Sequence, residues 1–529
     1  MIRAFLFYLS VLALALGCAA PPPEDAPPLL LVGIDGGEWQ VIEGLWREGR
    51  LPVLRSLADR GVRATLGTDY AASPVIWTTI ATGRLPRDHG ITDFVVPTPR
   101  GDVPVTSDLR RVPALWNMAS TAGRRVAVLG WWASWPAEPI TGVMVTDRVL
   151  LNLDRAFHPP ERQDWLDQHI AAAAADPVVP TAFDARGDVV RRDRLKGRLA
   201  ADLVRQPFDL WMVYFRNADV VSHTEWKYFD PEPFGDGVRD GLTAQERSAR
   251  AAAVPESYEA IDRALGEILA ALPPAANVLV VSDHGFKPET KEIAQVIFDL
   301  DAVLERLGYL ARDASGAVDF RRTQVYSYRS PKHKKGKTVR FSLAGREAGG
   351  AVLPRERTAL RERLARDLAR VTYDGGEPIF WLRDVRPPEA RLGADFVIGV
   401  TNDAPSRTLW LDGEPFEGPV EGITRITGTH DANTEGIFLA AGPDIDPRAQ
   451  LTGINIHDLA GTVLFGTGLP VGEDFAGTVR QELFRESFRQ RFPLRTVTSW
   501  GRRDVSGRAT SSEADAELLE ELGALGYLN

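Results

Sequence analysis

Val278-Leu279-Val280-Val281-Ser282-Asp283-His284-Gly285 is the stretch around which the chain is organised. Its apolar, mostly β-branched first half predicts a buried central strand, and Asp-His-Gly predicts the loop that follows it. Open α/β sheets bind ligands just beyond the carboxyl ends of their strands. Asp283 and His284 offer one oxygen and one nitrogen ligand, which suits a transition metal. Taken alone, the dipeptide also fits a polar loop after a core strand, so the other strand ends must be considered.

Two further apolar stretches are followed by acidic and histidine side chains. Leu29 to Ile34 ends at Asp35, and residues 210–215 precede Asp219 and His223. Asp219 and His223 are four residues apart, and on a helical turn this spacing places both side chains on one face, where they can share a metal. Each feature has a plainer alternative. Asp35 can cap a helix in a βα turn, and Asp219 and His223 can form a solvent-facing pair.

Ser73 and Pro74 indicate the start of a helix, with Ser73 at the N-cap and Pro74 at the first helical position. A hydroxyl at a helix N-terminus lies beside free N–H groups and a dipole that favours phosphate. The alternative is that Ser73 only caps the helix. His89, which precedes Gly90, is expected to be structural.

The composition is that of a globular protein. The chain has 529 residues, of which 44% are hydrophobic and 25% charged. This length allows one large α/β domain with insertions, or two or three domains. The formal net charge of -10 argues against a nucleic-acid-binding surface as the main function.

The N-terminus has the pattern of an exported protein. Residues 1–17 carry one basic side chain and a short apolar run, which is typical of a signal peptide. Small residues before Cys18, the only cysteine, resemble a bacterial lipoprotein processing site, so we expect Cys18 to be lipidated. Residues 18–28 then form a proline-rich tether. Ala19 follows the cysteine where an Asp would indicate retention in the inner membrane. Its presence therefore favours the periplasmic side of the outer membrane. The alternative is an ordinary signal peptide with an incidental cysteine.

Changes in composition and in secondary-structure pattern divide the rest of the chain. We expect an α/β core from residues 29–290, an inserted α+β cap at 291–422, the second part of the core at 423–485 and a C-terminal extension at 486–529. The basic run that includes Lys332 to Lys337 predicts an exposed loop in the cap, and whether it reaches the site stays open. The charged residues 183–202 predict a solvated face. Residues 518–528 predict a Leu-rich helix docked on the core.

The strand ends and one core loop with His430 together supply six carboxylate or imidazole groups. These residues resemble the alkaline phosphatase superfamily, in particular its nucleotide pyrophosphatase/phosphodiesterase-like branch. The matching motifs are Gly33-Ile34-Asp35-Gly36, Ser73 through His89-Gly90-Ile91, Asp219-Val220-Val221-Ser222-His223, Ser282-Asp283-His284-Gly285-Phe286 and Gly428-Thr429-His430. Gly345-Arg346-Glu347 and the terminal Leu525-Gly526-Tyr527-Leu528 also look like bacterial members. The resemblance implies an alkaline-phosphatase-like α/β core with a mixed, mostly parallel central sheet flanked by helices, plus an inserted smaller α+β cap.

The resemblance also implies the roles of the site residues. It implies two divalent metal ions, most often zinc, with manganese as the alternative. The first ion, beside the nucleophile, is held by Asp35, Ser73, Asp283 and His284. The second ion is held by Asp219, His223 and His430. Ser73 is the implied nucleophile, and Thr78 and Thr79 are the fallback. Metal coordination activates a serine hydroxyl, and two metals about 4 Å apart can clamp the attacking and leaving oxygens of an in-line displacement. The implied substrate is a small phosphate ester.

The sequence departs from the family pattern at two places. Ser73 is followed by Pro74 and Val75 without the spaced Pro and Arg of sulfatases, which disfavours a sulfatase. Thr92-Asp93-Phe94 lacks the Asn usual in pyrophosphatase members, which puts nucleotide specificity in doubt.

A phosphodiesterase is favoured because residues Val75 to Trp77 are apolar beside Ser73. Phosphomonoesterase, phosphotransferase and non-catalytic envelope binding protein stay as alternatives, and the oligomeric state is unknown.

Overall fold

The structure is a computed structural model that describes residues 26–98, 101–151, 153–175, 188–235, 242–328, 336–374, 376–385, 393–401 and 406–527. The predicted signal peptide, Cys18 and most of the tether therefore lie outside the described residues. Among the helices within the described ranges, none is both long enough and apolar enough to cross a membrane.

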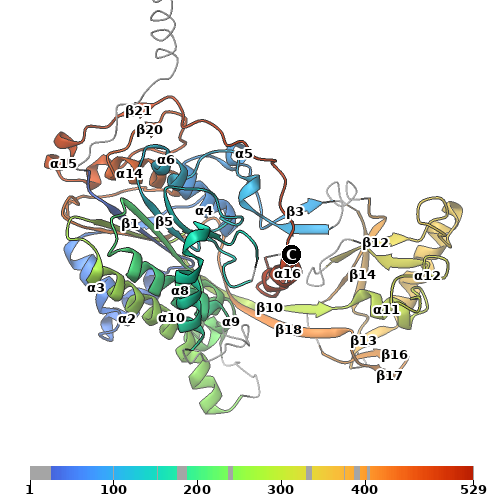
Figure 1. Ribbon diagram of the computed structural model, residues 1–529. Helices are drawn as coiled ribbons and strands as arrows, with labels where there is room; N and C mark the ends of the chain where they lie inside the picture. Colours follow the sequence, from blue (N-terminus) through green and yellow to red (C-terminus); the bar gives the residue numbers. More distant parts are fainter. Residues whose placement is uncertain are drawn as a thin grey trace, which may run out of the picture.

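An eight-stranded sheet forms the centre of the molecule (Figure 1), with the strand order β2-β19-β9-β1-β8-β5-β6-β7. Its strands are β1 (Leu29–Ile34), β2 (Val62–Leu66), β5 (Val126–Leu129), β6 (Gly142–Val145), β7 (Phe157–His158), β8 (Leu210–Phe215), β9 (Asn277–Val281) and β19 (Gly436–Ala441). β19 is antiparallel to both neighbours and β7 is antiparallel to β6, whereas the other pairings are parallel. This arrangement confirms the predicted mixed, mostly parallel sheet.

Both faces of the sheet are covered, which explains why its central strands are buried at every position and are mostly apolar. In β1, Leu30 and Val32 join the apolar cluster on one face, and Leu29 and Leu31 join the cluster on the other. The first face carries α2 (Trp39–Arg47), α3 (Pro52–Arg60), α8 (Asp188–Leu203), α9 (Asn217–Phe229) and α10 (Ala244–Ala271). The second face carries α4 (Ser73–Thr82), α6 (Leu115–Thr121), α14 (Leu459–Gly466) and α15 (Glu486–Arg491). Figure 1 shows these two layers below and above the sheet.

A smaller α+β lobe, called the cap, stands beside the core (Figure 1). It is carried by an antiparallel ribbon of β10 (Lys287–Phe298) and β18 (Val420–Thr429), and the predicted boundaries at 291 and 422 fall within these two strands. Its other elements are α11 (Leu300–Arg306), β11 (Val325–Ser327), β12 (Gly336–Phe341), α12 (Arg357–Leu368), β13 (Val371–Tyr373), β14 (Phe380–Asp384), β15 (Phe396–Val400), β16 (Leu409–Leu411) and β17 (Glu414–Phe416). The cap has its own apolar cluster, which includes Val339, Leu364 and Phe396.

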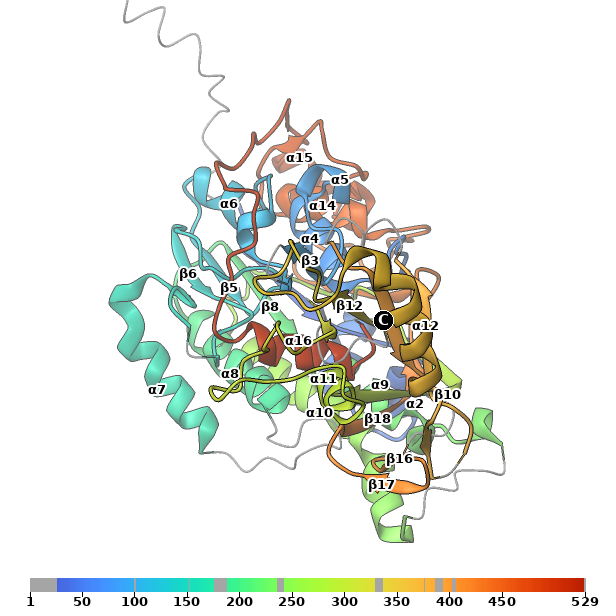
Figure 2. The ribbon, with the colours of Figure 1, turned by 90° about the vertical axis from the view of Figure 1, so that its right-hand side faces the viewer.

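The C-terminal extension returns to the junction of core and cap. After β20 (Val471–Gly472) and β21 (Thr496–Val497), the chain crosses the core and ends in α16 (Asp515–Ala524). α16 contacts β10 and β4 (Gly101–Pro104). Figures 1 and 2 both show it against the core on the side that faces the cap. The helix predicted for residues 518–528 therefore begins and ends earlier than expected.

Two predictions about charged segments need correction. Residues 183–202 were expected to form a solvated face, but the described part, α8, packs Leu195 and Leu199 into the core and buries Lys196 beside Asp193 at 2.7 Å. The second prediction was an exposed loop for the basic run. Its residues up to 335 lie outside the described part of the chain. Lys337 is described, and it is buried in β12 with its amine 5.0 Å from the centre of the Phe298 ring. In both places the aliphatic part of a lysine side chain packs in the interior. The ammonium group pairs with Asp193 in the case of Lys196 and lies over the Phe298 ring in the case of Lys337.

The layered core makes a prediction about stability. Leu31→Ala removes a side chain that is 0% exposed at the centre of the sheet, and it should lower the free energy of unfolding by about 2–5 kcal/mol. Leu494→Ala is the matched control, because Leu494 is 36% exposed and its loss should cost less than about 0.5 kcal/mol. Urea denaturation followed by circular dichroism measures both. Equal losses for the two variants would contradict this description of the core.

Candidate metal centre and active site

Six side chains that the sequence predicted as metal ligands gather in two groups of three at the carboxyl edge of the sheet. The first ligand group is Asp35, Asp283 and His284, and the second ligand group is Asp219, His223 and His430. Within each group the potential ligand atoms all lie within 4.8 Å of one another. The residues come from the loops after β1 and β9, from the first two turns of α9 and from the end of β18. Elements far apart in the sequence therefore meet at this edge.

Close backbone approach at Gly36 brings the two groups together. Gly36 has a φ of +65°, and a Cβ at this position would lie 3.0 Å from the Cα of Asp219. Its N–H donates to Asp283 Oδ1 at 3.3 Å. A larger residue would push α9 away from the loop after β1, so this position requires glycine.

The plainer alternatives for these acidic residues are not what the structure shows. The N-cap of α2 is Glu38 and not Asp35. Asp219 and His223 are 0% and 3% exposed, so they do not form a solvent-facing pair. Buried polar groups require partners, and these side chains therefore need an explanation beyond surface solvation.

Lone pairs face one another in the first ligand group. His284 Nδ1 lies 2.9 Å from the carbonyl oxygen of Gly285, which can only accept, so Nδ1 carries the hydrogen and Nε2 presents a lone pair. This Nε2 lies 3.4 Å from Asp35 Oδ1 and 3.3 Å from Asp283 Oδ2. None of the three atoms has a hydrogen-bond partner among the described residues. Two ligands of a tetrahedral zinc, each about 2.0–2.1 Å from it, lie about 3.3 Å apart, so these atoms fit a zinc ion.

The second ligand group repeats the pattern. His223 Nδ1 lies 3.0 Å from the carbonyl oxygen of Gly428, which leaves Nε2 facing Asp219 Oδ1 at 3.3 Å. Asp219 Oδ1 and His430 Nδ1 have no hydrogen-bond partner in the described part of the chain. The His430 ring stacks on His284 with centroids 3.4 Å apart, which joins the two groups. Mixed carboxylate and imidazole ligands suit zinc, and they can also hold manganese.

The electrostatics of the site also favour bound cations. Burial, reinforced by neighbouring carboxylates, raises the pKa values of Asp35 and Asp283. Burial and the nearby His284 and His223 hold the pKa of His430 well below its ordinary value, so its ring is a neutral ligand at pH 7. Burial opposes the ionisation of Asp219 as well, but the surrounding histidines outweigh it and lower the pKa of this carboxyl. Divalent cations would compensate this concentration of acidic groups.

The hydroxyl of Ser73 is buried and unpaired. Ser73 is the first residue of α4 and Ala72 is the N-cap, so the predicted N-cap position was wrong by one residue. Ser73 Oγ makes no capping bond and has no hydrogen-bond partner among the described residues. In contrast, Thr78 and Thr79 donate to the carbonyl oxygens of Pro74 and Val75 at 2.7 and 2.8 Å. The unengaged hydroxyl favours Ser73 over either threonine as the nucleophile.

His89 has a structural setting. Its Nδ1 accepts from the N–H of Ile91 at 3.1 Å, and its Nε2 lies 3.2 Å from Thr79 Oγ1. Burial and the nearby Arg110 lower its pKa to about 3, so the ring stays neutral at physiological pH. The ring therefore connects α4 to the following loop.

A cavity of about 310 Å³ opens onto the second ligand group. It is lined by Ala71, Ala72, Asp93, Phe94, His223, Ile426, Thr429, His430, Leu525, Gly526 and Tyr527. Because Ala71 and Ala72 immediately precede Ser73, the cavity lies beside the nucleophile candidate. The apolar residues expected beside Ser73 do not line it, since Ile76 and Trp77 belong to the core. That part of the prediction is corrected.

Sequence reasoning missed two tyrosines that hold the ligand carboxylates. Tyr214, from the end of β8, donates from its hydroxyl to Asp35 Oδ2 and accepts from Trp132 Nε1 at 2.6 Å. Tyr527, from the C-terminal segment, donates to Asp219 Oδ2 at 2.6 Å. Only the resemblance of the last residues to bacterial family members gave a signal for Tyr527. Neither strand periodicity nor motif spacing indicated either contact.

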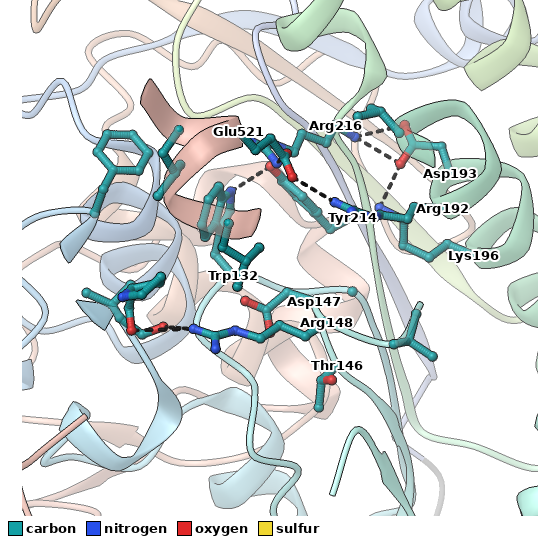
Figure 3. Close-up of a pocket in the computed structure, with 18 residues that line it drawn as sticks. Trp132, Thr146, Asp147, Arg148, Arg192, Asp193, Lys196, Tyr214, Arg216 and Glu521 are labelled. Atoms are coloured by element: carbon teal, nitrogen blue, oxygen red, sulfur yellow. Dashed lines mark hydrogen bonds and ion pairs between the residues drawn. The ribbon is translucent and has the colours of Figure 1, made fainter. Parts of the chain in front are cut away.

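A smaller cavity of about 50 Å³ is lined by residues that include Trp132 and Tyr214 (Figure 3). Arg216 places its guanidinium 5.1 Å from the centre of the Trp132 ring and is paired with Glu521 of α16. Arg192 pairs with the other oxygen of Glu521 at 3.2 Å. Both arginines are therefore already paired with a carboxylate.

Zinc should stabilise the metal-free protein in a pH-dependent manner. A ligand at 100 times its Kd adds about 2.7 kcal/mol to the free energy of unfolding. The gain should be larger at pH 7 than at pH 5, because protons compete with zinc for the ligand carboxylates as the pH falls, and the raised pKa values of Asp35 and Asp283 strengthen that competition. Thermal unfolding of chelator-treated protein with and without zinc measures the gain. Asp283→Ala should reduce it, and an equal gain at both pH values would contradict this electrostatic description.

Comparisons with known proteins identify the family of the chain. Residues 29–407, more than half of the chain, match the sequence profile of the family described as type I phosphodiesterase/nucleotide pyrophosphatase. No curated protein sequence is significantly similar to the chain.

Solved structures with similar folds include murine ectonucleotide pyrophosphatase/phosphodiesterase 5, an inactive form in complex with AMP. It is 14% identical, the match covers 87% of this chain and 100% of that one, and the TM-score is 0.43. Phosphonoacetate hydrolase from Sinorhizobium meliloti, in complex with phosphonoformate, is 16% identical over 84% of this chain and 97% of that one, with a TM-score of 0.43. On the strength of the profile match, this chain belongs to the type I phosphodiesterase/nucleotide pyrophosphatase family.

Proposed function

We propose that the protein is a two-metal phosphodiester hydrolase that acts through a covalent phospho-Ser73 intermediate. The observation that carries the proposal is the set of unpaired ligand atoms. Asp35, Ser73, Asp219, Asp283, His284 and His430 each present a buried nitrogen or oxygen without a hydrogen-bond partner in the described part of the chain. A buried polar atom without a partner costs about 1–3 kcal/mol, so a group of them in one place calls for an external ligand. Two divalent cations supply that ligand.

The proposed reaction has two displacement steps. Ser73 Oγ attacks the phosphorus of the ester, a P–O bond to Ser73 forms, and the bond to the leaving alcohol breaks. The hydroxyl proton of Ser73 passes to water, and the leaving oxygen takes up a proton from water, so the step consumes no net proton. Water then attacks the phosphorus of phospho-Ser73, which releases a phosphomonoester and restores the hydroxyl. Divalent cations held by the two ligand groups would activate the nucleophile and stabilise the charge on the transferring group.

The charge distribution supports a diester substrate. A phosphomonoester carries more negative charge and needs cationic donors beyond the metals. Among the described residues that line the 310 Å³ cavity there is no lysine or arginine, and Asp93 adds an acidic side chain. Arg216 is paired with Glu521. A singly charged diester therefore suits this cavity better than a dianion.

Two other functions stay as alternatives. A phosphotransferase would pass the phosphoryl group from Ser73 to an alcohol in place of water. A non-catalytic binding lipoprotein would have no use for a buried serine hydroxyl without a hydrogen-bond partner. The unpaired Ser73 Oγ therefore favours an enzyme over a binding protein.

The proposal makes a prediction about substrate preference. The purified, zinc-loaded protein should hydrolyse bis-p-nitrophenyl phosphate with a higher kcat/KM than p-nitrophenyl phosphate. Release of p-nitrophenol at 405 nm measures both rates on the same preparation. A higher kcat/KM for the monoester would reverse the assignment to a phosphomonoesterase.

Variants of α4 provide the control for the same assay. Ser73→Ala should reduce kcat by several orders of magnitude and keep both bound metals, whereas Thr79→Val should keep most of the activity. If neither ester is cleaved by the wild type while both metals are bound, a phosphotransferase becomes the better assignment.

We also propose that the protein is anchored to the membrane by a lipidated Cys18 on the periplasmic side of the outer membrane. Its support is the sequence alone, since residues 1–25 lie outside the described residues. Wild-type protein should be found in the membrane fraction with a diacylglyceryl cysteine at its N-terminus, as measured by mass spectrometry. Cys18→Ser should abolish this modification and leave the precursor unprocessed. A mature wild-type protein with an unmodified N-terminus would indicate simple secretion.

A further inference from the structure

The hydroxyl of Tyr527 lies in the second ligand group. It donates to Asp219 Oδ2 at 2.6 Å and lies 2.8 Å from His223 Nε2. Because His223 Nδ1 carries its hydrogen toward the carbonyl oxygen of Gly428, Nε2 presents a lone pair to the tyrosine oxygen. The hydroxyl has one proton for two acceptors. When a cation takes the lone pair of His223, that proton is left for Asp219 alone.

The contact at Tyr527 has a counterpart in the first ligand group. Tyr214 donates to Asp35 Oδ2, which leaves Asp35 Oδ1 unpaired, and Tyr527 donates to Asp219 Oδ2, which leaves Asp219 Oδ1 unpaired. In each group one carboxylate oxygen is therefore fixed by a tyrosine and the other faces the remaining ligands. Hydrogen bonds of this kind orient the carboxylates that hold metals in proteins.

Ion pairs fix α16, and with it Tyr527, against the core. Glu521 pairs with Arg216 and Arg192, and all three side chains are 12–13% exposed. Figure 3 shows Glu521 reaching from its helix toward these two arginines. Asp515, at the first turn of the helix, lies 3.4 Å from Arg148. Breaking these mostly buried ion pairs would cost free energy, so α16 stays attached to the core beside the site.

Apolar contacts complete the attachment of the C-terminal segment. The Tyr527 ring stacks on Phe94 with centroids 4.4 Å apart and an angle of 12° between the planes. Leu522 packs in the cluster around Phe94, and Leu525 packs with Val189 and Val220 of the core. The ring position is therefore set by packing, and the hydroxyl position follows from it.

We propose that Tyr527 is a positioning residue for the second metal. Its hydroxyl holds Asp219 with Oδ1 directed toward His223 and His430, and α16 holds the tyrosine through Glu521. The C-terminal segment is thus needed to complete the metal centre, in the way that Tyr214 completes the first ligand group. This inference rests on the two-metal function proposed above.

The test is zinc affinity, which is measured without any substrate. Zinc is titrated into the full-length, chelator-treated protein in competition with a chromophoric chelator. The wild type should bind two zinc ions, and Tyr527→Phe should bind one of them about 10- to 100-fold more weakly. Asp283→Ala, which disables the first ligand group, assigns the ion. In that background, the addition of Tyr527→Phe should weaken the one remaining zinc by the same factor.

Matched variants separate the hydroxyl from the ring. Tyr527→Leu removes both and should weaken zinc as much as Tyr527→Phe does. Tyr326→Phe removes a similar tyrosine–carboxylate bond, 2.8 Å to Glu347 in the cap, and should leave both zinc affinities unchanged. Glu521→Gln should weaken the same zinc ion by a smaller factor. Thermal unfolding of the metal-free variants checks that each is folded.

The outcomes distinguish this inference from the proposed function. If the wild type binds two zinc ions and Tyr527→Phe binds both equally tightly, the role of the hydroxyl is wrong while the two-metal function stands. If only Tyr527→Leu weakens zinc, the ring matters and the hydroxyl does not, which also overturns the inference. A wild type that binds no zinc would refute the two-metal function and the inference together.

Discussion

At the carboxyl edge of the central sheet, buried nitrogen and oxygen atoms of acidic and histidine side chains face one another, and most of them have no hydrogen-bond partner among the described residues. His284 Nε2 faces Asp35 Oδ1 and Asp283 Oδ2, and His223 Nε2 faces Asp219 Oδ1, at separations of 3.3–3.4 Å. In a desolvated site such contacts are repulsive unless a proton or a cation lies between them, and the proposed function places a divalent cation there. The need for that cation connects the fold, which creates the burial, with the chemistry, which uses the charge.

The fold creates this site by bringing distant segments to one edge. β1 and β9 lie side by side and end together, so their loops deliver the first ligand group. Gly36 lets α9 approach closely enough to add Asp219 and His223, and the ribbon that carries the cap adds His430 at the end of β18. The segment after the C-terminal helix α16 adds Tyr527, whose hydroxyl donates to Asp219. Insertion of the cap between two parts of the core is compatible with the site because both strands of the ribbon leave from this edge.

Residues that follow buried strands could be predicted because both signals are local. The apolar run Val278–Val281 indicates a strand covered on both faces, and its last residue fixes where Asp283 and His284 begin. Long-range contacts could not be predicted in this way. Tyr527 and Asp219 are 308 positions apart, and nothing in either local pattern indicates their contact. α8 was misread for a related reason, since its charged composition conceals the inner stripe of Leu195 and Leu199.

The central claim is that two divalent cations occupy the space between the unpaired ligand atoms. Anomalous diffraction at the zinc absorption edge, from crystals of the zinc-loaded protein, tests it most directly. The account predicts two peaks, one among Asp35, Asp283 and His284 and one among Asp219, His223 and His430. No peak in either group, or zinc bound only elsewhere on the molecule, would contradict it.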